Sequence, residues 1–589
     1  MTEEPAGIYV STLEELKKKG CMSFNVDGYD LVIFYHEGCV YALDNRCPHM
    51  GFPLSRGTTK EGILTCDWHH ARFDLKSGGT FDLWAGDVPS FPTQVQNGKV
   101  WVKIGQHKDI RELHKQRLQE GLEQNNGLLI AKSVIALLSS GIEPAELIRI
   151  GIKHGITYRQ DGWGQGLTIL VCMVNLLPIL SSEDRSRALF HGLSAVAQDC
   201  DGVAPRFAVK GLPDMAPDVV TLKGWFRHFI EVRDSDGAER CLVSAIQAKP
   251  KPDPLEIADI LFSAATDHRY LDGGHILDFT NKAFEVLEVV GWDMAEGILS
   301  SLVPLYARAT RMEERSSWRH PVDLSKILDR SFREIPSSLE LGRKKRGSWK
   351  VDKSFVDTLL GDKPDQIADI LLNAIRNGAT EQELAVCVEY ASVLRIVYFG
   401  TSNEFSDWDS ALHTYTFSHA VQRSLHRLSS VELLRAVFDV AMSVYLIRFL
   451  NVPPSSIPTS AAQENTEEPD IFAKKFLEVL DKRQQVSDAS ELVTRYVTSG
   501  GDQERLLAVL GNALLREDRN FHSIQMIEAA FGQWKSMLQT KVSLLDQSSI
   551  LVAAARYLAA HSPTVRRQGQ MFEIAFRLHR GAKLYEGIE

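Results

Sequence analysis

The sequence predicts an all-β N-terminal domain followed by a large all-α region made of two similar helical lobes. Three observations predict this architecture. Up to about residue 105, short apolar runs alternate with turn residues, as in the strands of a small antiparallel domain. From Gly127 onward, apolar residues recur at i, i+3, i+4 and i+7, which is the period of an amphipathic helix. An internal repeat then divides the helices into two lobes.

The composition is that of a globular protein. The chain has 589 residues, with 44% apolar and 24% charged residues, and its formal net charge of −10 argues against nucleic acid as the main partner. We expect no signal peptide, because the N-terminus is acidic and lacks an apolar run. The longest apolar run, residues 167–180, is too short for a membrane span. Most of the eight cysteines are scattered, which predicts a reducing, cytoplasmic location.

The strands of the N-terminal domain follow from alternating short runs and their turns. Asp27-Gly28 and Asn97-Gly98 are typical of hairpin turns. A short helix is expected at Thr12–Leu16. We expect strands at residues 8–11, 21–26, 29–35, 40–43, 63–66, 72–74 and 91–102.

The helical region reads as a series of amphipathic segments with two interruptions. The first helices are expected at residues 128–138, 144–155, 166–180, 185–196, 255–265, 275–290 and 293–307. A second run extends from about 365 to 450, and a third from 471 to 585. Between them, residues 335–362 are expected to form a linker, and the Pro/Ser/Glu-rich residues 451–470 a loop.

The two halves of the helical region repeat short patterns in the same order. Trp163-Gly-Gln-Gly-Leu can be aligned with Trp408-Asp-Ser-Ala-Leu, and the segment that begins at His275 with the one that begins at His522. The repeat predicts a duplication, with lobes related by a pseudo-twofold axis. The expected boundaries are 1–107 for the β domain, 108–126 for a helical connector, 127–334 for lobe 1, 335–362 for the linker and 363–589 for lobe 2.

Two thiols and two imidazoles stand in two short segments of the β domain. The first segment reads Cys47-x-His49 and the second reads Cys66-x-x-His69, with sixteen residues between His49 and Cys66. Thiolate ligands suit zinc or iron–sulfur clusters, and imidazole suits zinc, copper or iron. A structural zinc site is one interpretation, since zinc takes sets of two Cys and two His. A [2Fe-2S] centre with two Cys on one iron and two His on the other is the second.

The residues around these ligands resemble the two cluster loops of a Rieske ferredoxin. The resemblance extends over roughly residues 8–105 and rests on Cys47-Pro-His-Met-Gly-Phe-Pro-Leu54 and Cys66-Asp-Trp-His-His-Ala-Arg-Phe73. It implies a Rieske [2Fe-2S] cluster on Cys47, His49, Cys66 and His69. The family's respiratory members carry Ser and Tyr hydroxyls where this chain has Ala71 and Phe73, which predicts a potential at the low end of the range, about −150 mV.

One residue departs from the pattern of the ferredoxins that supply oxygenases. Those proteins usually carry Gly where this chain has His70. The side chain is either solvated or alters the exposure of the cluster.

A one-electron centre next to a helical region raises the question of where electrons go. The paired histidines and strands of the catalytic domain in Rieske oxygenases are not found, so the chain is not an ordinary member of that group. Histidines near apolar helices form a tentative second metal site, with His275 and His522 as candidate catalytic residues because they occupy matching places in the repeat. The full tentative set is His154, His191, His275, His419 and His522. A structural role for each of them is the alternative.

The sequence supports three hypotheses. In the first, the cluster delivers electrons to a metal-dependent, oxygen-using site in the lobes, with non-haem iron as the metal and a small organic substrate. In the second, the protein is an electron carrier whose lobes are a docking scaffold for a separate oxygenase or reductase. The third is a redox sensor. No flavin or nicotinamide fingerprint is present, so an external ferredoxin or flavin reductase is the expected electron donor.

Overall fold

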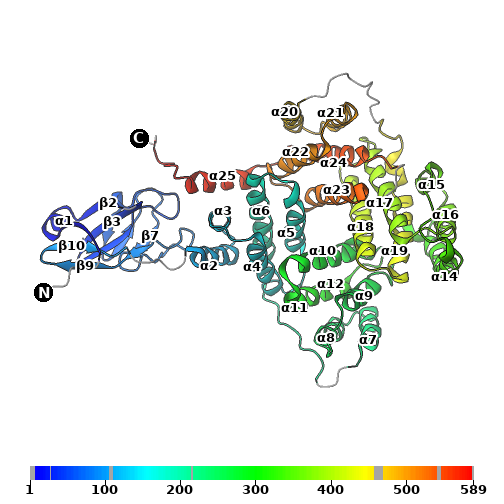
Figure 1. The fold of residues 1–589 in the computed structure, drawn as a ribbon, viewed down its shortest axis with the longest axis horizontal. Coiled ribbons are helices and arrows are strands. Elements are labelled where there is room, and N and C mark those ends of the chain that lie inside the picture. The colour runs from blue at the N-terminus through cyan, green and yellow to red at the C-terminus, as the bar shows by residue number, and fades with distance from the viewer. Residues whose placement is uncertain are drawn as a thin grey trace. The chain divides into compact units, whose positions relative to one another are not determined.

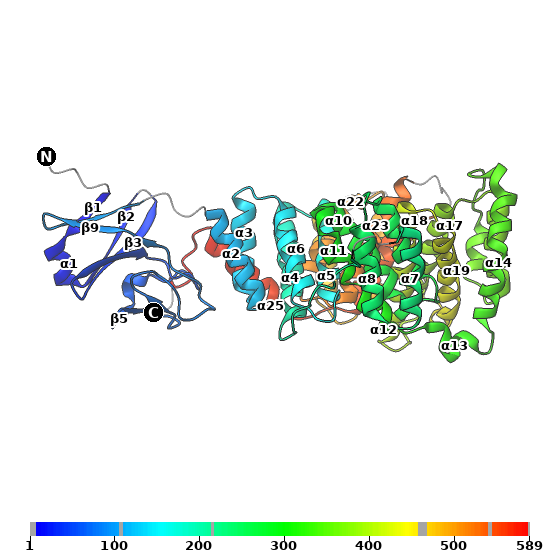
Figure 2. The same ribbon diagram turned by 90° about the horizontal axis from the view of Figure 1, so that it is seen from below.

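The chain folds into two compact units, and the sequence of one is inserted into the sequence of the other. The computed structural model describes residues 7–26, 28–104, 110–213, 217–456, 468–539 and 545–586. Unit 1 comprises Met1–Leu147 together with Gln570–Glu589, and unit 2 comprises Ile148–Gly569 (Figure 1). Unit 1 holds the described strands, and unit 2 is all-α in its described residues (Figures 1 and 2).

The β domain of unit 1 consists of three small antiparallel sheets. Their strand orders are β1-β10-β9, β2-β3-β4-β8 and β5-β6-β7. The strands are β1 (Ile8–Thr12), β2 (Cys21–Val26), β3 (Tyr29–His36), β4 (Cys39–Asp44), β5 (Thr58–Lys60), β6 (Ile63–Thr65), β7 (Arg72–Asp74), β8 (Ser90–Phe91), β9 (Thr93–Gln96) and β10 (Lys99–Val102), with helix α1 (Leu13–Lys19) after β1. One loop follows β4, and a second joins β6 to β7. These two loops carry the Cys and His pairs.

The strands agree with the sequence prediction, including one hairpin turn, except that β5 was not predicted. Asn97 and Gly98 join β9 to β10 with φ angles of 55° and 72°, the left-handed conformation that such a turn needs. Asp27, in the other predicted turn, lies outside the described residues.

Unit 1 also contains helices from both ends of the chain. Helices α2 (Ile110–Glu123) and α3 (Gly127–Ser139) follow the β domain, and α25 (Arg567–His579) enters unit 1 at its C-terminal part. Beyond α25, the Tyr585 ring lies 5.5 Å from Phe52 and 6.4 Å from Trp68, measured between ring centroids. Tyr585 therefore packs against the hydrophobic core beneath the two loops.

Unit 2 is assembled from helices of one to six turns. After α4 (Pro144–Thr157) they are α5 (Gln165–Leu176), α6 (Ser182–Cys200), α7 (Val219–Glu231), α8 (Ser235–Ile246), α9 (Pro254–Ala265), α10 (His275–Val290), α11 (Ala295–Ser300), α12 (Val303–Arg308), α13 (Ser316–Arg319), α14 (Leu324–Gly342), α15 (Lys353–Leu359), α16 (Pro364–Arg376), α17 (Glu381–Val397), α18 (Asp407–Arg427), α19 (Val431–Leu446), α20 (Pro469–Leu480), α21 (Val486–Thr498), α22 (Gln503–Leu515), α23 (Phe521–Gln539) and α24 (Ser548–Ala560). No helix among the described residues has the length and apolarity to cross a membrane. The internal duplication stays a prediction.

The segment predicted as a linker at 335–362 is partly helical. Helix α14 continues through Pro336 to Gly342, and α15 lies within the same range. A helix-internal proline costs about 3 kcal/mol. Buried packing offsets this cost, because Leu328 and Ile335 are fully buried and Gly342 lies so close to the Ile375 carbonyl that a Cβ atom would be 2.0 Å from the oxygen. Residues 457–467 of the predicted 451–470 loop lie outside the described residues.

A buried ammonium group joins two central helices of unit 2. Lys282 of α10 is 1% exposed, and its Nζ lies 3.0 Å from Glu285 and 2.6 Å from Glu528 of α23. Asn175 of α5 donates to the same two carboxylates at 2.8 and 2.7 Å. Although burial acts in the opposite direction, attraction to Glu285 and Glu528 raises the pKa of Lys282. The group is therefore charged in the folded protein and ties α10 to α23.

Replacement of Lys282 by Met should destabilise the folded chain by about 3–5 kcal/mol, because two buried carboxylates lose their cation. The free energy of unfolding from urea denaturation measures this change. The matched control on the same helix is Glu288→Gln, which removes the surface ion pair with Arg427 and should cost about 1 kcal/mol or less. Equal effects of the two variants would contradict the role of Lys282.

Candidate functional site

The two loops of the β domain have the same backbone hydrogen-bond pattern. In the first loop (residues 47–52), the Cys47 N–H donates to the Phe52 carbonyl and the Gly51 N–H to the Cys47 carbonyl, both at 2.8 Å. In the second loop (residues 66–71), Cys66 donates to Ala71 at 2.8 Å and His70 to Cys66 at 2.9 Å. The two cysteines therefore occupy equivalent positions in two similar turns.

Each turn requires a left-handed residue four positions after its cysteine. Gly51 has φ 77° in the first loop, and His70 has φ 63° in the second. This geometry explains why glycine is the ordinary residue at the place of His70, because a residue with a Cβ atom is strained there. The His70 side chain is exposed, so its imidazole points to solvent.

The turns bring the two thiols and the two imidazoles together. The Cys47 and Cys66 side chains are 3% and 1% exposed, and their thiols hydrogen-bond to each other. The His49 and His69 rings lie 4.8 Å apart, measured between centroids. Nδ1 of His49 is buried and has no hydrogen-bond partner among the described residues. The orphaned nitrogen indicates that this imidazole is placed for a ligand that is not a protein side chain.

Backbone amides and a lysine surround the first loop. The N–H groups of His49 and Met50 hydrogen-bond to the Cys47 thiol and lower its pKa, although the contact with Cys66 and burial raise it more. Lys132 of α3 donates from Nζ to the backbone carbonyls of Pro48, at 2.8 Å, and of His49. Burial, with Lys132 and His69 nearby, lowers the pKa of His49 to about 4, so the ring is neutral and able to bind a metal.

The two histidines differ in exposure. His69 is exposed, whereas His49 is partly covered by Trp84, with ring centroids 4.8 Å apart. Ala71 and Phe73 are fully buried and offer no hydroxyl group to the thiols. Access from solvent is therefore through the His69 side of the site.

A second constellation lies in unit 2. His275 of α10, His413 of α18 and His522 of α23 present nitrogen atoms that all lie within 4.8 Å of one another, and they are the one group among the described residues with the spacing for a single metal ion. Nε2 of His413 lies 2.9 Å from Nε2 of His522. The His275 ring is 4.7 Å from the His413 ring, measured between centroids. Burial, with neighbouring imidazoles, lowers the pKa of His275 to about 3 and that of His413 to about 4.

The local backbone places His275 at the first position of α10. Tyr270, Asp272, Gly273 and Gly274 before it all have positive φ, from 49° to 95°. Gly274 admits no side chain, because a Cβ atom there would lie 2.6 Å from Cβ of Phe417 on α18. Close approach of α18 to this turn fixes the position from which His275 projects.

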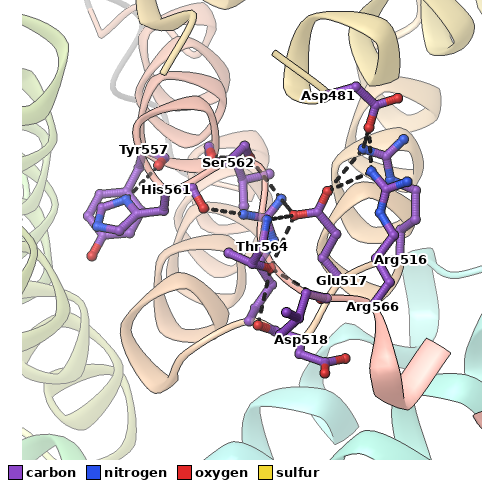
Figure 3. A network of polar contacts seen from close by, with 12 residues as sticks. Asp481, Arg516, Glu517, Asp518, Tyr557, His561, Ser562, Thr564 and Arg566 are labelled. Carbon is purple, nitrogen blue, oxygen red and sulfur yellow. Dashed lines mark hydrogen bonds and ion pairs between the residues drawn. The ribbon is translucent and has the colours of Figure 1, made fainter. Parts of the chain in front are cut away.

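A polar network fixes the entry to α23, where His522 stands. The Glu517 carboxylate accepts from the Thr564 N–H at 2.8 Å and from Arg566 at 3.0 Å (Figure 3). The Asp518 carboxylate accepts from the backbone N–H groups of Arg567 and Gln568. Asn520 then caps the helix by accepting from the Ser523 N–H at 2.9 Å. The chain before His522 is thus held to the segment that follows α24.

A carboxylate stands behind His522. Asp409 lies one turn before His413 on α18, and its Oδ1 is 3.4 Å from Nδ1 of His522. The Tyr557 hydroxyl donates to Asp409 at 2.8 Å. Burial raises the pKa of Asp409, but the bonds from His522 and Tyr557 outweigh it and bring the pKa to about 2. The carboxylate is therefore ionised and holds His522 with Nε2 towards the other two rings.

The other histidines of the tentative set lie outside this group. His419 bonds Glu389 at 2.7 Å, His191 donates a hydrogen bond to the Leu515 backbone carbonyl, and the His154 ring lies beside that of Tyr158. His413 and Asp409 were not among the candidates from sequence. Their spacing of four within the predicted helical run of 365–450 places them on one helix face, but only the structure brings that face to His522.

The N-terminal domain matches a known family. The model of the Rieske [2Fe-2S] domain matches residues 7–92. The chain is 30% identical over 82 residues to the ferredoxin component of the p-cumate 2,3-dioxygenase system of Pseudomonas putida, which is 14% of this chain and 70% of that protein. It is 27% identical over 103 residues to the ferredoxin subunit of 3-phenylpropionate/cinnamic acid dioxygenase of Photorhabdus laumondii, 17% of this chain and 97% of that protein.

A longer relative matches over a similar length. The chain is 30% identical over 107 residues to the oxidoreductase NdmD of Pseudomonas putida, which is 16% of this chain and 18% of NdmD. The chain thus spans less than a fifth of that relative. A Rieske domain carries a [2Fe-2S] cluster and serves iron–sulfur electron transfer. Through its N-terminal domain, this chain belongs to the Rieske [2Fe-2S] family.

Proposed function

We propose that the protein is an oxidoreductase in which Cys47, His49, Cys66 and His69 hold a Rieske [2Fe-2S] cluster, which supplies one-electron transfer to a metal-dependent, oxygen-using site in the helical unit. The observation that carries the first part is the convergence of two thiols and two imidazoles from two matching turns. Each turn contributes one Cys and one His, so sulfur ligands and nitrogen ligands each come from both loops.

The four side chains fit a Rieske [2Fe-2S] cluster. The donor set is two thiols and two imidazoles, which is the ligand set of a Rieske centre. Nδ1 of His49 is buried without a partner among the described residues, and the contact between the Cys47 and Cys66 thiols leaves both sulfurs free to bind metal once deprotonated. Zinc is less suited, because structural zinc sites with two Cys and two His use different spacings.

The surrounding residues set how electrons enter and leave. His69 is exposed, so we propose that an external ferredoxin or flavin reductase donates at this imidazole. Lys132 places an ammonium against the backbone of the first loop, and this charge favours the more negative, reduced form. Ala71 and Phe73 lower the reduction potential, because they offer no hydroxyl group to the sulfurs. The Lys132 ammonium raises the reduction potential.

The proposal of an internal acceptor is supported by the three clustered imidazoles of unit 2. A small organic substrate and oxygen are the proposed co-reactants. The alternative is an electron carrier whose helices dock a separate oxygenase or reductase, or a redox sensor. Relatives named as ferredoxin components of dioxygenase systems favour the carrier.

Replacement of His69 by Ala should abolish the Rieske signal in the EPR spectrum of the dithionite-reduced full chain, because one iron loses its nitrogen ligand. The matched control is His70→Ala, the exposed neighbour, which should keep the signal. Far-UV circular dichroism should stay helical in both variants. A Rieske signal that survives in His69→Ala would exclude His69 as a ligand.

Replacement of Lys132 by Met should lower the reduction potential by about 60 mV, the equivalent of one decade in a one-electron equilibrium. The reason is the loss of a positive charge beside the cluster loop. An EPR-monitored redox titration measures the shift. Lys153, exposed on α4, provides the control by replacement with Met. An unchanged potential in Lys132→Met would mean that the ammonium does not influence the cluster.

An internal acceptor should make the reduced full chain consume oxygen faster than its His275→Ala variant, by at least about tenfold, with the cluster signal equal in both. An oxygen electrode and the rate of cluster reoxidation give the two readouts. Equal rates in the two proteins would favour the carrier, whose reoxidation needs a separate partner.

A further inference from the structure

We propose that His275, His413 and His522 bind one divalent first-row transition-metal ion, with Asp409 as the carboxylate that positions His522. The binding of this ion does not depend on the proposed function, but its role as the electron acceptor does. The inference rests on the arrangement of side chains from three helices, α10, α18 and α23, that converge at one place in unit 2.

The first support is the relation between the ring nitrogens. Two imidazole nitrogens on one tetrahedral ion lie roughly 3.4 Å apart, since each is about 2.1 Å from the metal. The His413 and His522 Nε2 atoms are 2.9 Å apart, and all three ligand atoms lie within 4.8 Å. Small rotations of the rings therefore bring three nitrogens to an ion without movement of the helices.

The second support is the group behind one of the ligands. Metal-binding histidines commonly bond a carboxylate through their second nitrogen, which fixes the ring and makes it a better donor. His522 has Asp409 at Nδ1 and faces the His413 ring with Nε2. Tyr557 in turn bonds Asp409. This order of a carboxylate, an imidazole and a second nitrogen that faces the other rings is the order found at metal sites.

The third support is rigidity and access. The strained turn before His275 and the polar network before His522 fix the backbone at two of the ligands. The third ligand, His413, lies within the long helix α18. All three imidazoles are half-buried, and the His522 side chain is 20% exposed. Such a site is built in advance and can be reached from solvent.

The ligand set indicates the class of metal. Three imidazoles without a thiolate suit iron, zinc, copper, cobalt or nickel, and they do not suit calcium or magnesium, which take oxygen ligands. Asp409 supplies one negative charge near the ion. Phe279 and Phe521 stand beside His275, with ring centroids 5.3 and 5.9 Å from its ring, so the surroundings on this side are apolar.

The test is a Co²⁺ titration of the EDTA-treated full chain, followed by visible absorption and by metal analysis. One Co²⁺ should bind per chain in addition to the cluster iron. His413→Ala should weaken binding by at least a hundredfold, and Asp409→Asn by about 10–100-fold. The matched control is His426→Ala, an exposed histidine on the same helix, which should bind Co²⁺ as the natural chain does.

Two further measurements separate loss of the metal from loss of the fold. Circular dichroism and thermal unfolding follow the fold, and His275→Ala, on another helix, must lose Co²⁺ as His413→Ala does. Equal Co²⁺ affinity in the natural chain and in both alanine variants, or no bound Co²⁺ at all, would overturn the proposal. The Rieske EPR signal is recorded in every sample. Its absence from a chain that binds Co²⁺ would count against the proposed function alone.

Discussion

The helical unit depends on the pairing of α10 with α23 through the Lys282 ammonium. This cation lies between Glu285 and Glu528, and Asn175 bonds the same carboxylates from α5. A buried charge of this kind adds little net stability over an apolar contact, but it must keep its partners, because a buried charge without a partner is costly. Because His275 and His522 stand at the first turns of these two helices, the pairing also brings their imidazoles together.

In unit 1, two similar turns bring the candidate ligands together. Two loops with the same backbone hydrogen bonds present Cys47 and Cys66 in equivalent places, and the imidazoles differ only by one residue of spacing. The backbone sets the geometry of these loops. The side chains between the Cys and His residues can therefore vary, except where a positive φ favours glycine. Lys132 then adds a charge from outside the β domain. Ligand identity and electrostatic tuning therefore come from different parts of the sequence.

Most of the β domain could be predicted, because its strands alternate and its ligand motif is local. The match between the segments that begin at His275 and His522 also led to these two histidines as a pair, and their rings lie beside each other. His413 could not be found in this way, since no repeat partner marks it and only the packing of α18 against α23 brings it to the site. His419 was a candidate for its apolar helix, yet Glu389 satisfies it. Helices α7 and α8 and the helical part of 335–362 were missed, because local signals there are weak and tertiary packing decides.

The insertion of unit 2 into unit 1 affects how the protein is made. Tyr585, which packs on Phe52 and Trp68 beneath the two loops, leaves the ribosome after the whole helical unit has been synthesised. This ring contact therefore forms only after the helical unit has been made. A product truncated within the helical unit would lack this ring contact against the two loops of the β domain.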